Sequence, residues 1–316
     1  MSWNIRTDLA IENREIYQKA ERIEDEIPGI KTDFKNISND LKVTKVEVLT
    51  EEGERALGKP KGKYYTLEAE NLHLGIEEID NQVENEVSKI LKELLQLKSE
   101  DKVLVVGLGN EEVTPDSIGP KVISKIDVTS HLIKYVPEYI KEGTRPVSAI
   151  IPGVIGTTGI ETGDIIKAVA EKTNPNKIIV VDALAARDMK RIKNTIQISD
   201  TGIIPGAGVG NNRKRLSEET IGVPVIAIGV PTVVDSKTIV NDVIEGLIEK
   251  NKINDKKKEE YYHFIKEKIP EIETNSIVTP TEIDEVVANV SEIIATGINI
   301  ALNWVNVLLI NAIKIL

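Results

Sequence analysis

The chain of 316 residues contains no cysteine and three histidines. Without cysteine it has no thiol nucleophile, no disulfide bond and no cysteine-ligated zinc site, which fits a reducing compartment. The histidines (His73, His131 and His263) form no His-Glu-x-x-His motif, and no Gly-x-Ser-x-Gly motif occurs. The zincin and α/β-hydrolase classes therefore lack their catalytic residues. If the chain is a hydrolase, carboxylates must carry its chemistry.

The charge balance and the two ends of the chain bear on its partners. With 51 acidic and 40 basic residues, the formal charge is −11, and such a surface repels nucleic-acid phosphate. The first residues contain no apolar secretion core, so we expect a cytoplasmic protein. The last twenty residues are strongly apolar, but Asn299, Asn303 and Asn306 recur at helical spacing. This polar stripe predicts a packed or oligomer-forming helix rather than a membrane span.

The hydrophobic pattern predicts an α/β fold. Between residues 101 and 250, short apolar segments alternate with helical stretches, which is typical of a mostly parallel sheet covered on both faces. We expect a three-layer α/β/α domain with a mixed, mostly parallel sheet and a small N-terminal β element. The expected strands of this core are 103–106, 147–151, 178–181 and 225–228, with 195–198 as an edge strand. The first hundred residues are charged and irregular, and there we expect strands at 42–49 and 64–68 and a helix at 79–97. The expected parts are a pro-segment (1–8), an N-terminal extension packed on the core (9–100), the catalytic core (101–250), and a polar insert with C-terminal helices (251–316).

Two aspartates follow apolar strands of this core. Asp116 comes shortly after strand 103–106, and Asp182 directly follows strand 178–181. Catalytic groups in open α/β sheets gather beyond the carboxyl ends of the strands, so these side chains face each other if the two strands are neighbours. Two facing carboxylates can share one proton and activate a water molecule. Asp116 and Asp182 are therefore the candidate catalytic pair.

The local sequence gives expectations for the charge of each carboxyl group. Thr114-Pro115-Asp116 has the chemistry of a helix start, where the dipole would keep Asp116 ionised. Apolar surroundings would raise the pKa of Asp182. This asymmetry suits one base and one acid, but the sequence does not assign the two roles.

Two other motifs have simpler interpretations. Gly107-Leu108-Gly109 after a strand resembles a dinucleotide fingerprint, but the third glycine is replaced by Glu112, whose charge would repel a pyrophosphate. Asp200-Thr201-Gly202 matches the tripeptide of pepsin-like and retroviral proteases, which need two copies on an all-β fold. Because the tripeptide occurs once, within an α/β pattern, we interpret it as a turn.

The N-terminal segment has the character of a peptide that is recognised by its side chains. The acidic Asp8 precedes the large apolar Leu9 and the small Ala10, and a second acid, Glu12, follows. A pair of pockets, one basic and one apolar, could bind such a segment.

The chain resembles the germination protease family, the endopeptidases of spore-forming Firmicutes, over nearly its whole length. The resemblance is carried by specific motifs such as Asp182-Ala183-Leu184-Ala185-Ala186-Arg187. The matching segments are residues 6–10, 105–110, 114–116, 145–150, 159–162, 182–187, 196–200 and 225–235.

The resemblance implies a protease that degrades small acid-soluble spore proteins during germination, in the forespore or spore core. It implies a zymogen that removes its own N-terminal segment, a homotetramer, and an atypical aspartic pair without metal or organic cofactor. The functional aspartates of the family match Asp116 and Asp182. On this basis we expect self-cleavage between Asp8 and Leu9.

A more distant similarity is to the nickel-dependent hydrogenase maturation proteases. These also have Gly-x-Gly-Asn after a strand, and they place metal-binding acids at the positions of Asp116 and Asp182. Their later histidine ligand has no counterpart here, since His263, in the polar insert, is the only histidine after Asp182. A maturation protease of this type is the first alternative, and a non-catalytic binding protein on the same fold is the second.

Overall fold

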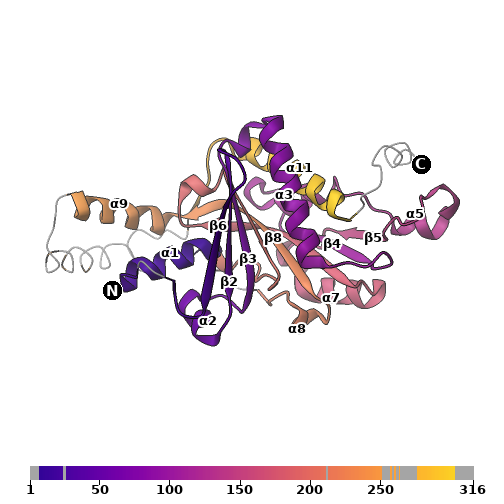
Figure 1. Ribbon diagram of the computed structural model, residues 1–316, viewed down its shortest axis with the longest axis horizontal. Helices are drawn as coiled ribbons and strands as arrows, with labels where there is room; N and C mark the ends of the chain where they lie inside the picture. The colour runs from indigo at the N-terminus through magenta and orange to yellow at the C-terminus, as the bar shows by residue number, and fades with distance from the viewer. Residues whose placement is uncertain are drawn as a thin grey trace.

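A computed structural model describes residues 7–23, 26–210, 213–250, 257, 260, 263 and 276–302. Within these residues, nine strands form one sheet in the order β1-β2-β3-β7-β8-β6-β4-β5, with β9 pairing with β8 (Figure 1). The strands are β1 (Ile30–Asn36), β2 (Leu41–Val48), β3 (Gly62–Ala69), β4 (Val103–Gly107), β5 (Val147–Ile150), β6 (Lys177–Ala186), β7 (Thr195–Ser199), β8 (Val225–Asp235) and β9 (Ile277–Val278). The principal helices are α1 (Ala10–Glu21), α2 (Glu51–Leu57), α3 (Glu77–Leu95), α4 (Ile118–Ile123), α5 (Ser130–Tyr135), α7 (Thr162–Thr173), α8 (Glu218–Ile221), α9 (Ser236–Lys250) and α11 (Ile283–Leu302).

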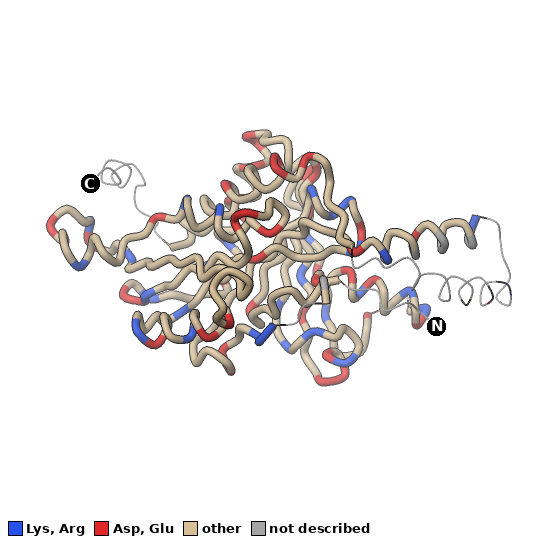
Figure 2. The backbone as a smooth tube through the Cα atoms, turned by 180° about the vertical axis from the view of Figure 1, so that it is seen from behind, with Lys and Arg blue, Asp and Glu red and all other residues tan. Residues whose placement is uncertain are grey.

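The central strands are buried on both faces, which explains their unbroken apolar sequences. Side chains alternate across a strand, so Val103 and Val105 of β4 join the core beneath α3 and α11, while Leu104 and Val106 join the core beneath α7 and α8. Figure 1 shows these two pairs of helices on opposite sides of the strands. In Figure 2 the charged residues lie mainly along peripheral helices and loops, and the central strands carry few of them. The predicted three-layer α/β/α architecture with a mixed sheet is confirmed.

The parallel part of the sheet is smaller than predicted. β4 pairs in parallel with β5 and β6, and β6 with β8, whereas the pairs of β1–β2, β2–β3, β3–β7 and β7–β8 are antiparallel. The N-terminal strands therefore extend the main sheet instead of forming a separate element. The predicted edge strand β7 lies inside the sheet, because it pairs with β8 on one side and with β3 on the other.

The first hundred residues are more regular than their sequence indicates. β2, β3 and α3 lie where they were predicted, but α1 and β1 were missed. β1 buries little beyond Ile30, and α1 buries only its first three residues, so neither has a clear hydrophobic period. α1, α2, β2 and β3 enclose a small core of their own.

The described part of the C-terminal region packs against the sheet. α11 is long and apolar enough to cross a membrane, but it contacts α3 and α4, and Val287, Val290 and Ile294 are buried there. Asn299 joins α11 to the segment that follows α4, since its Oδ1 accepts from Asp127 N (3.0 Å) and its Nδ2 donates to Lys125 O (3.1 Å). Asn303, Asn306 and most of the predicted polar insert lie outside the described residues.

Candidate active site

Neighbouring strands carry the two candidate aspartates. β4 and β6 pair in parallel, and their last paired residues are Gly107 and Val181. β6 continues to Ala186, so Asp182 lies inside a strand and not after its end as predicted. It is the first residue of β6 beyond the end of β4, and its partner on the other side is Gly229 of β8. The end of β4 thus opens a crevice beside Asp182.

Asp116 reaches this crevice from the loop after β4. It ends a single turn of 3₁₀ helix, Thr114–Asp116, and its Oδ2 accepts from Asn110 N (2.9 Å). Gly109 makes this approach possible. A Cβ there would lie 1.9 Å from the Asp116 carbonyl oxygen, and the φ of +110° is one that other residues rarely adopt.

Asp116 and Asp182 line one cavity of about 420 Å³, which we call the aspartate cavity. Leu108, Asp8 and Arg213 contribute to its walls. Strand β6 and the loop after β4 therefore bring the two predicted catalytic carboxylates together, although Asp116 and Asp182 are 66 positions apart in the sequence. The arrangement is suited to sharing a proton.

Burial raises the pKa of both groups, and negative neighbours raise that of Asp182 further. Asp182 is only 5% exposed, and this burial, then the nearby charges of Asp116 and Asp8, hold its pKa well above the usual range. Burial also raises the pKa of Asp116, although the hydrogen bond from Asn110 N–H opposes the shift. The expectation for Asp182 is confirmed in direction.

The helix dipole that was expected to keep Asp116 ionised does not set the direction of its pKa shift. The 3₁₀ turn has three residues, and Asp116 is its last one. Asp116 precedes Ser117, the N-cap of the short helix α4, and desolvation still determines the direction of its pKa shift.

The N-terminal arm, residues 7–12, lies against the aspartate cavity. Asp8 N donates to Ala185 O (2.9 Å), and Ala185 N donates to Asp8 Oδ2 (2.9 Å). Gly208 also hydrogen-bonds this carboxylate through its backbone, and a Cβ on Gly208 would lie 2.1 Å from it. Leu9 is fully buried in the main core. Both residues of the predicted cleavage site are therefore held in fixed positions.

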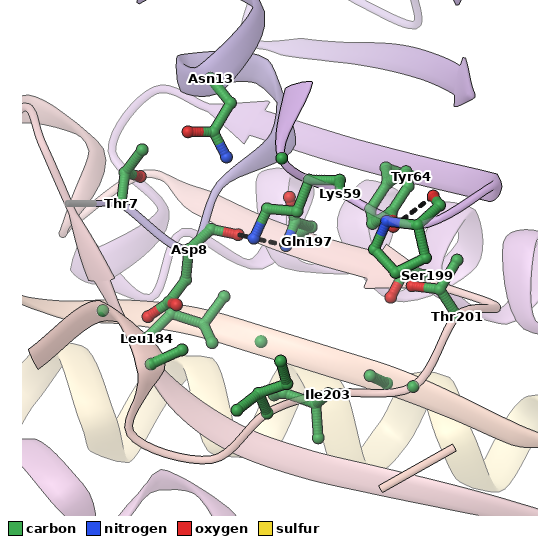
Figure 3. Close-up of a pocket in the computed structure, with 18 of the residues that line it drawn as sticks. Thr7, Asp8, Asn13, Lys59, Tyr64, Leu184, Gln197, Ser199, Thr201 and Ile203 are labelled. Carbon is green, nitrogen blue, oxygen red and sulfur yellow. Dashed lines mark hydrogen bonds between the residues drawn. The ribbon is translucent and has the colours of Figure 1, made fainter. Parts of the chain in front are cut away.

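Asp8 also lines a second cavity of about 300 Å³, the arm cavity (Figure 3). Lys59, Tyr64, Gln197 and Ser199 contribute to its lining. Lys59 Nζ and Gln197 Nε2 donate to the carbonyl oxygen of Asp8, at 2.9 and 3.2 Å. Sequence reasoning missed both residues, because an isolated lysine in a turn and a glutamine in a short strand carry no motif.

Glu12 anchors the far end of the arm. Its carboxylate is 2% exposed and accepts from Arg187 N (2.7 Å) and Asp188 N (3.0 Å), and from the hydroxyl of Thr7. Arg191 lies 3.6 Å away as an ion-pair partner. The acidic side chain of Glu12 is therefore bound largely by backbone amides, and not by a pocket of mainly basic side chains.

The alternative motifs have structural roles. A Cβ on Gly107 would lie 2.3 Å from the carbonyl oxygen of Gly119, so this glycine allows α4 to pack closely on β4. Asp200 Oδ1 accepts from Lys63 N (2.7 Å), and Gly202 has a φ of +71°, so the Asp-Thr-Gly tripeptide forms a turn as predicted. Thr201 and Gly202 line the arm cavity.

Among the described residues, no group of three or more His, Cys, Asp or Glu side chains could hold a metal ion.

Comparison with known proteins identifies the family. The model of the germination protease family matches residues 10–260. The chain belongs to the germination protease family. Family members from Clostridium perfringens and Clostridium tetani are each 48% identical, over 312 and 315 residues, and both alignments cover 95% of each chain. A germination protease from Geobacillus is 39% identical over 352 residues, covering 95% of this chain and 94% of the relative.

The family is one of proteases, and this chain is therefore a protease. Among solved structures, the NiFe hydrogenase maturation protease HycI from Thermococcus kodakarensis aligns with 66% of this chain and 97% of its own, with a TM-score of 0.33 and 14% identity.

Proposed function

We propose that the chain is a zymogen that cleaves its own Asp8–Leu9 bond and then degrades small acid-soluble spore proteins, using Asp116 and Asp182 to activate water. One observation carries this proposal. Asp8, the residue on the amino side of the bond, lines the same cavity as the two aspartates. Its charge also contributes to the raised pKa of Asp182, so the two carboxyl groups are close.

The environments of the two aspartates favour one assignment of roles. Asp182 is the more buried group and has two negative neighbours, so it holds the shared proton. Asp116 is only half-buried and no negative neighbour among the described residues raises its pKa, so it ionises first. Asp116 then takes a proton from water as the oxygen attacks the carbonyl carbon of Asp8, and Asp182 protonates the nitrogen of Leu9 as the C–N bond breaks. The products are a carboxyl group on Asp8 and a new amino terminus at Leu9.

The remaining expectations belong to the same proposal. The enzyme works as a homotetramer in the forespore and spore core, with no metal or organic cofactor. Its substrates coat DNA, but the enzyme itself does not bind nucleic acid, in keeping with its charge of −11.

Replacement of each aspartate tests the proposal. Asp116→Asn and Asp182→Asn should each slow self-cleavage and the cleavage of spore-protein peptides by about 10²–10⁴-fold, while the circular dichroism spectrum stays that of the wild type. Mass spectrometry of the amino terminus and a peptide-cleavage assay measure the two rates. Asp200→Asn is the matched control, because this aspartate belongs to the Asp-Thr-Gly turn, and its rates should be unchanged.

Three results would reject the proposal. An Asp116→Asn/Asp182→Asn double variant that still cuts at the wild-type rate removes the aspartates from the mechanism. Loss of wild-type activity on chelation, with recovery on added nickel, would favour the metal-dependent alternative. A non-catalytic binding protein would keep its N-terminus intact and turn over no substrate.

A further inference from the structure

The carbonyl oxygen of Asp8 accepts hydrogen bonds from two side chains. Lys59 Nζ lies 2.9 Å away and Gln197 Nε2 lies 3.2 Å away. The donors come from separate elements, the turn between α2 and β3 and the middle of β7. In Figure 3 both nitrogens point at this oxygen, while the Asp8 carboxylate points away from them, toward Leu184. The predicted scissile carbonyl is thus held from one side by two donors.

The amide of Gln197 can have only one orientation here. Its Oε1 accepts from Ala10 N (2.7 Å), so its Nε2 must face the oxygen of Asp8. A flipped amide would place two donors together at Ala10 and two acceptors together at Asp8. Gln197 is 8% exposed, and one side chain therefore binds the peptide groups on both sides of Leu9.

Lys59 is placed where its charge acts strongly. Burial lowers the pKa of this lysine, and the negative charge of Asp8 opposes the shift. An ammonium group in a site with little water interacts more strongly with a developing oxyanion than with a neutral carbonyl. Such preorganised donors selectively stabilise the transition state of carbonyl addition.

We propose that Lys59 and Gln197 form the oxyanion site for cleavage of the Asp8–Leu9 bond, and that they are catalytic residues in addition to the aspartate pair. This inference rests on the proposed function. As water adds to the carbonyl carbon, the π electrons move to the Asp8 oxygen, whose negative charge Lys59 and Gln197 stabilise. When the electrons return, the bond to Leu9 N breaks and Asp182 supplies the proton to this nitrogen. Asp8 lines both the aspartate cavity and the arm cavity, so residues of both act on one peptide group.

A purely structural role makes a different prediction. If Lys59 and Gln197 only fix the arm, a variant that keeps the arm in place should cleave at the normal rate. Gln197→Glu separates the two roles, because it keeps the acceptor for Ala10 N and removes the donor to Asp8. Lys59→Arg keeps a cation in the turn, whereas Lys59→Met removes it. Lys61→Met is the matched control, since Lys61 is an exposed lysine of the same turn, 4.0 Å from Glu51.

The experiment measures self-cleavage of the full chain. Each variant is made in a cell-free translation with a pulse of labelled amino acid, and mass spectrometry follows the first-order appearance of the chain that starts at Leu9. Hydrogen exchange of the Ala10 amide reports whether the arm is in place. Wild type and Asp116→Asn are measured in parallel.

We expect Lys59→Met and Gln197→Glu to lower the rate constant by about 100-fold or more with a protected Ala10 amide. Lys59→Arg should recover most of the loss, and Lys61→Met should match the wild type. Wild-type rates in Lys59→Met and Gln197→Glu would overturn the inference and leave the aspartate mechanism intact. Slow cleavage that always accompanies an exposed Ala10 amide would also overturn it, in favour of an anchoring role. If the wild type itself is never cleaved at Leu9, the proposed self-processing fails, and the inference fails with it.

Discussion

Two buried carboxylates near the N-terminal arm have opposite surroundings. Glu12, at the end of the arm, has two backbone N–H donors, a hydroxyl and an arginine around it. Asp182, in the aspartate cavity, has one N–H donor, from Ala183, and two negative neighbours. Burial raises the pKa of both groups, but only at Glu12 do several partners oppose the shift. The arm region therefore satisfies its buried charge, and the aspartate cavity keeps a charge conflict that its chemistry can use.

The largest loss of stability is expected from a substitution at Gly109, which lines the aspartate cavity. In Gly109→Ala the new Cβ would overlap the Asp116 carbonyl at 1.9 Å, at a φ of +110°. We expect a loss of at least about 3 kcal/mol in the free energy of unfolding and a displaced Asp116, with slow self-cleavage. Urea unfolding and the mass-spectrometric assay measure these changes.

Gly143→Ala is the control for Gly109→Ala. Gly143 also has a positive φ, +85°, but a Cβ there would meet nothing within 4 Å. It should lose only about 1–2 kcal/mol and keep its activity. Equal losses at both glycines would mean that backbone strain, and not the packing of Asp116, explains the effect.

Replacing Glu12 tests the region where charge is satisfied. Glu12→Ala leaves the amides of Arg187 and Asp188 and the charge of Arg191 without this partner, so we expect a loss of about 3 kcal/mol in unfolding free energy. Glu15→Gln removes an exposed partner of Arg191 and should change stability by less than about 1 kcal/mol. Urea denaturation of the two variants gives both values. A stable Glu12→Ala protein would contradict the comparison.

Replacing Asp182 should raise the free energy of unfolding, whereas replacing Glu12 should lower it. Asp182→Asn is neutral without having to take up a proton when the chain folds, so at neutral pH the variant should be more stable than the wild type by about 1–3 kcal/mol. Because the pKa of Asp182 is raised in the folded state, folding favours the protonated form. The stability that Asp182 contributes to the wild type is therefore fully present below the pKa of this group in the unfolded chain. It is lost as the pH rises through the pKa of this group in the folded protein. The gain of the variant should vanish in acid, which unfolding curves at several pH values would show; a gain that is independent of pH would argue against this origin.

Local sequence was enough to predict most strands of the α/β core. The runs of β-branched residues in β4 and β6 and the helical period of α3 are signals that tertiary packing reinforces. They placed Asp116 after one strand and Asp182 at another, and the pairing of β4 with β6 meets the condition under which the two aspartates share a crevice. The arm cavity could not be predicted in this way, because Lys59 and Gln197 come from distant segments and meet at Asp8 only through the β3–β7 pairing. α1 and β1 were missed because few of their residues are buried.

The central claim is that Asp116 and Asp182 share one desolvated pocket, and the pKa of Asp182 measures it directly. Carbon-13 NMR of side-chain-labelled aspartate would follow this carboxyl group through a pH titration in the wild type and in Asp116→Asn. Removing the charge of Asp116 should lower the pKa of Asp182 from its raised wild-type value, because repulsion from Asp116 is the second-largest cause of the shift, after burial. An Asp182 pKa that is ordinary in the wild type, or the same in both proteins, would contradict the account.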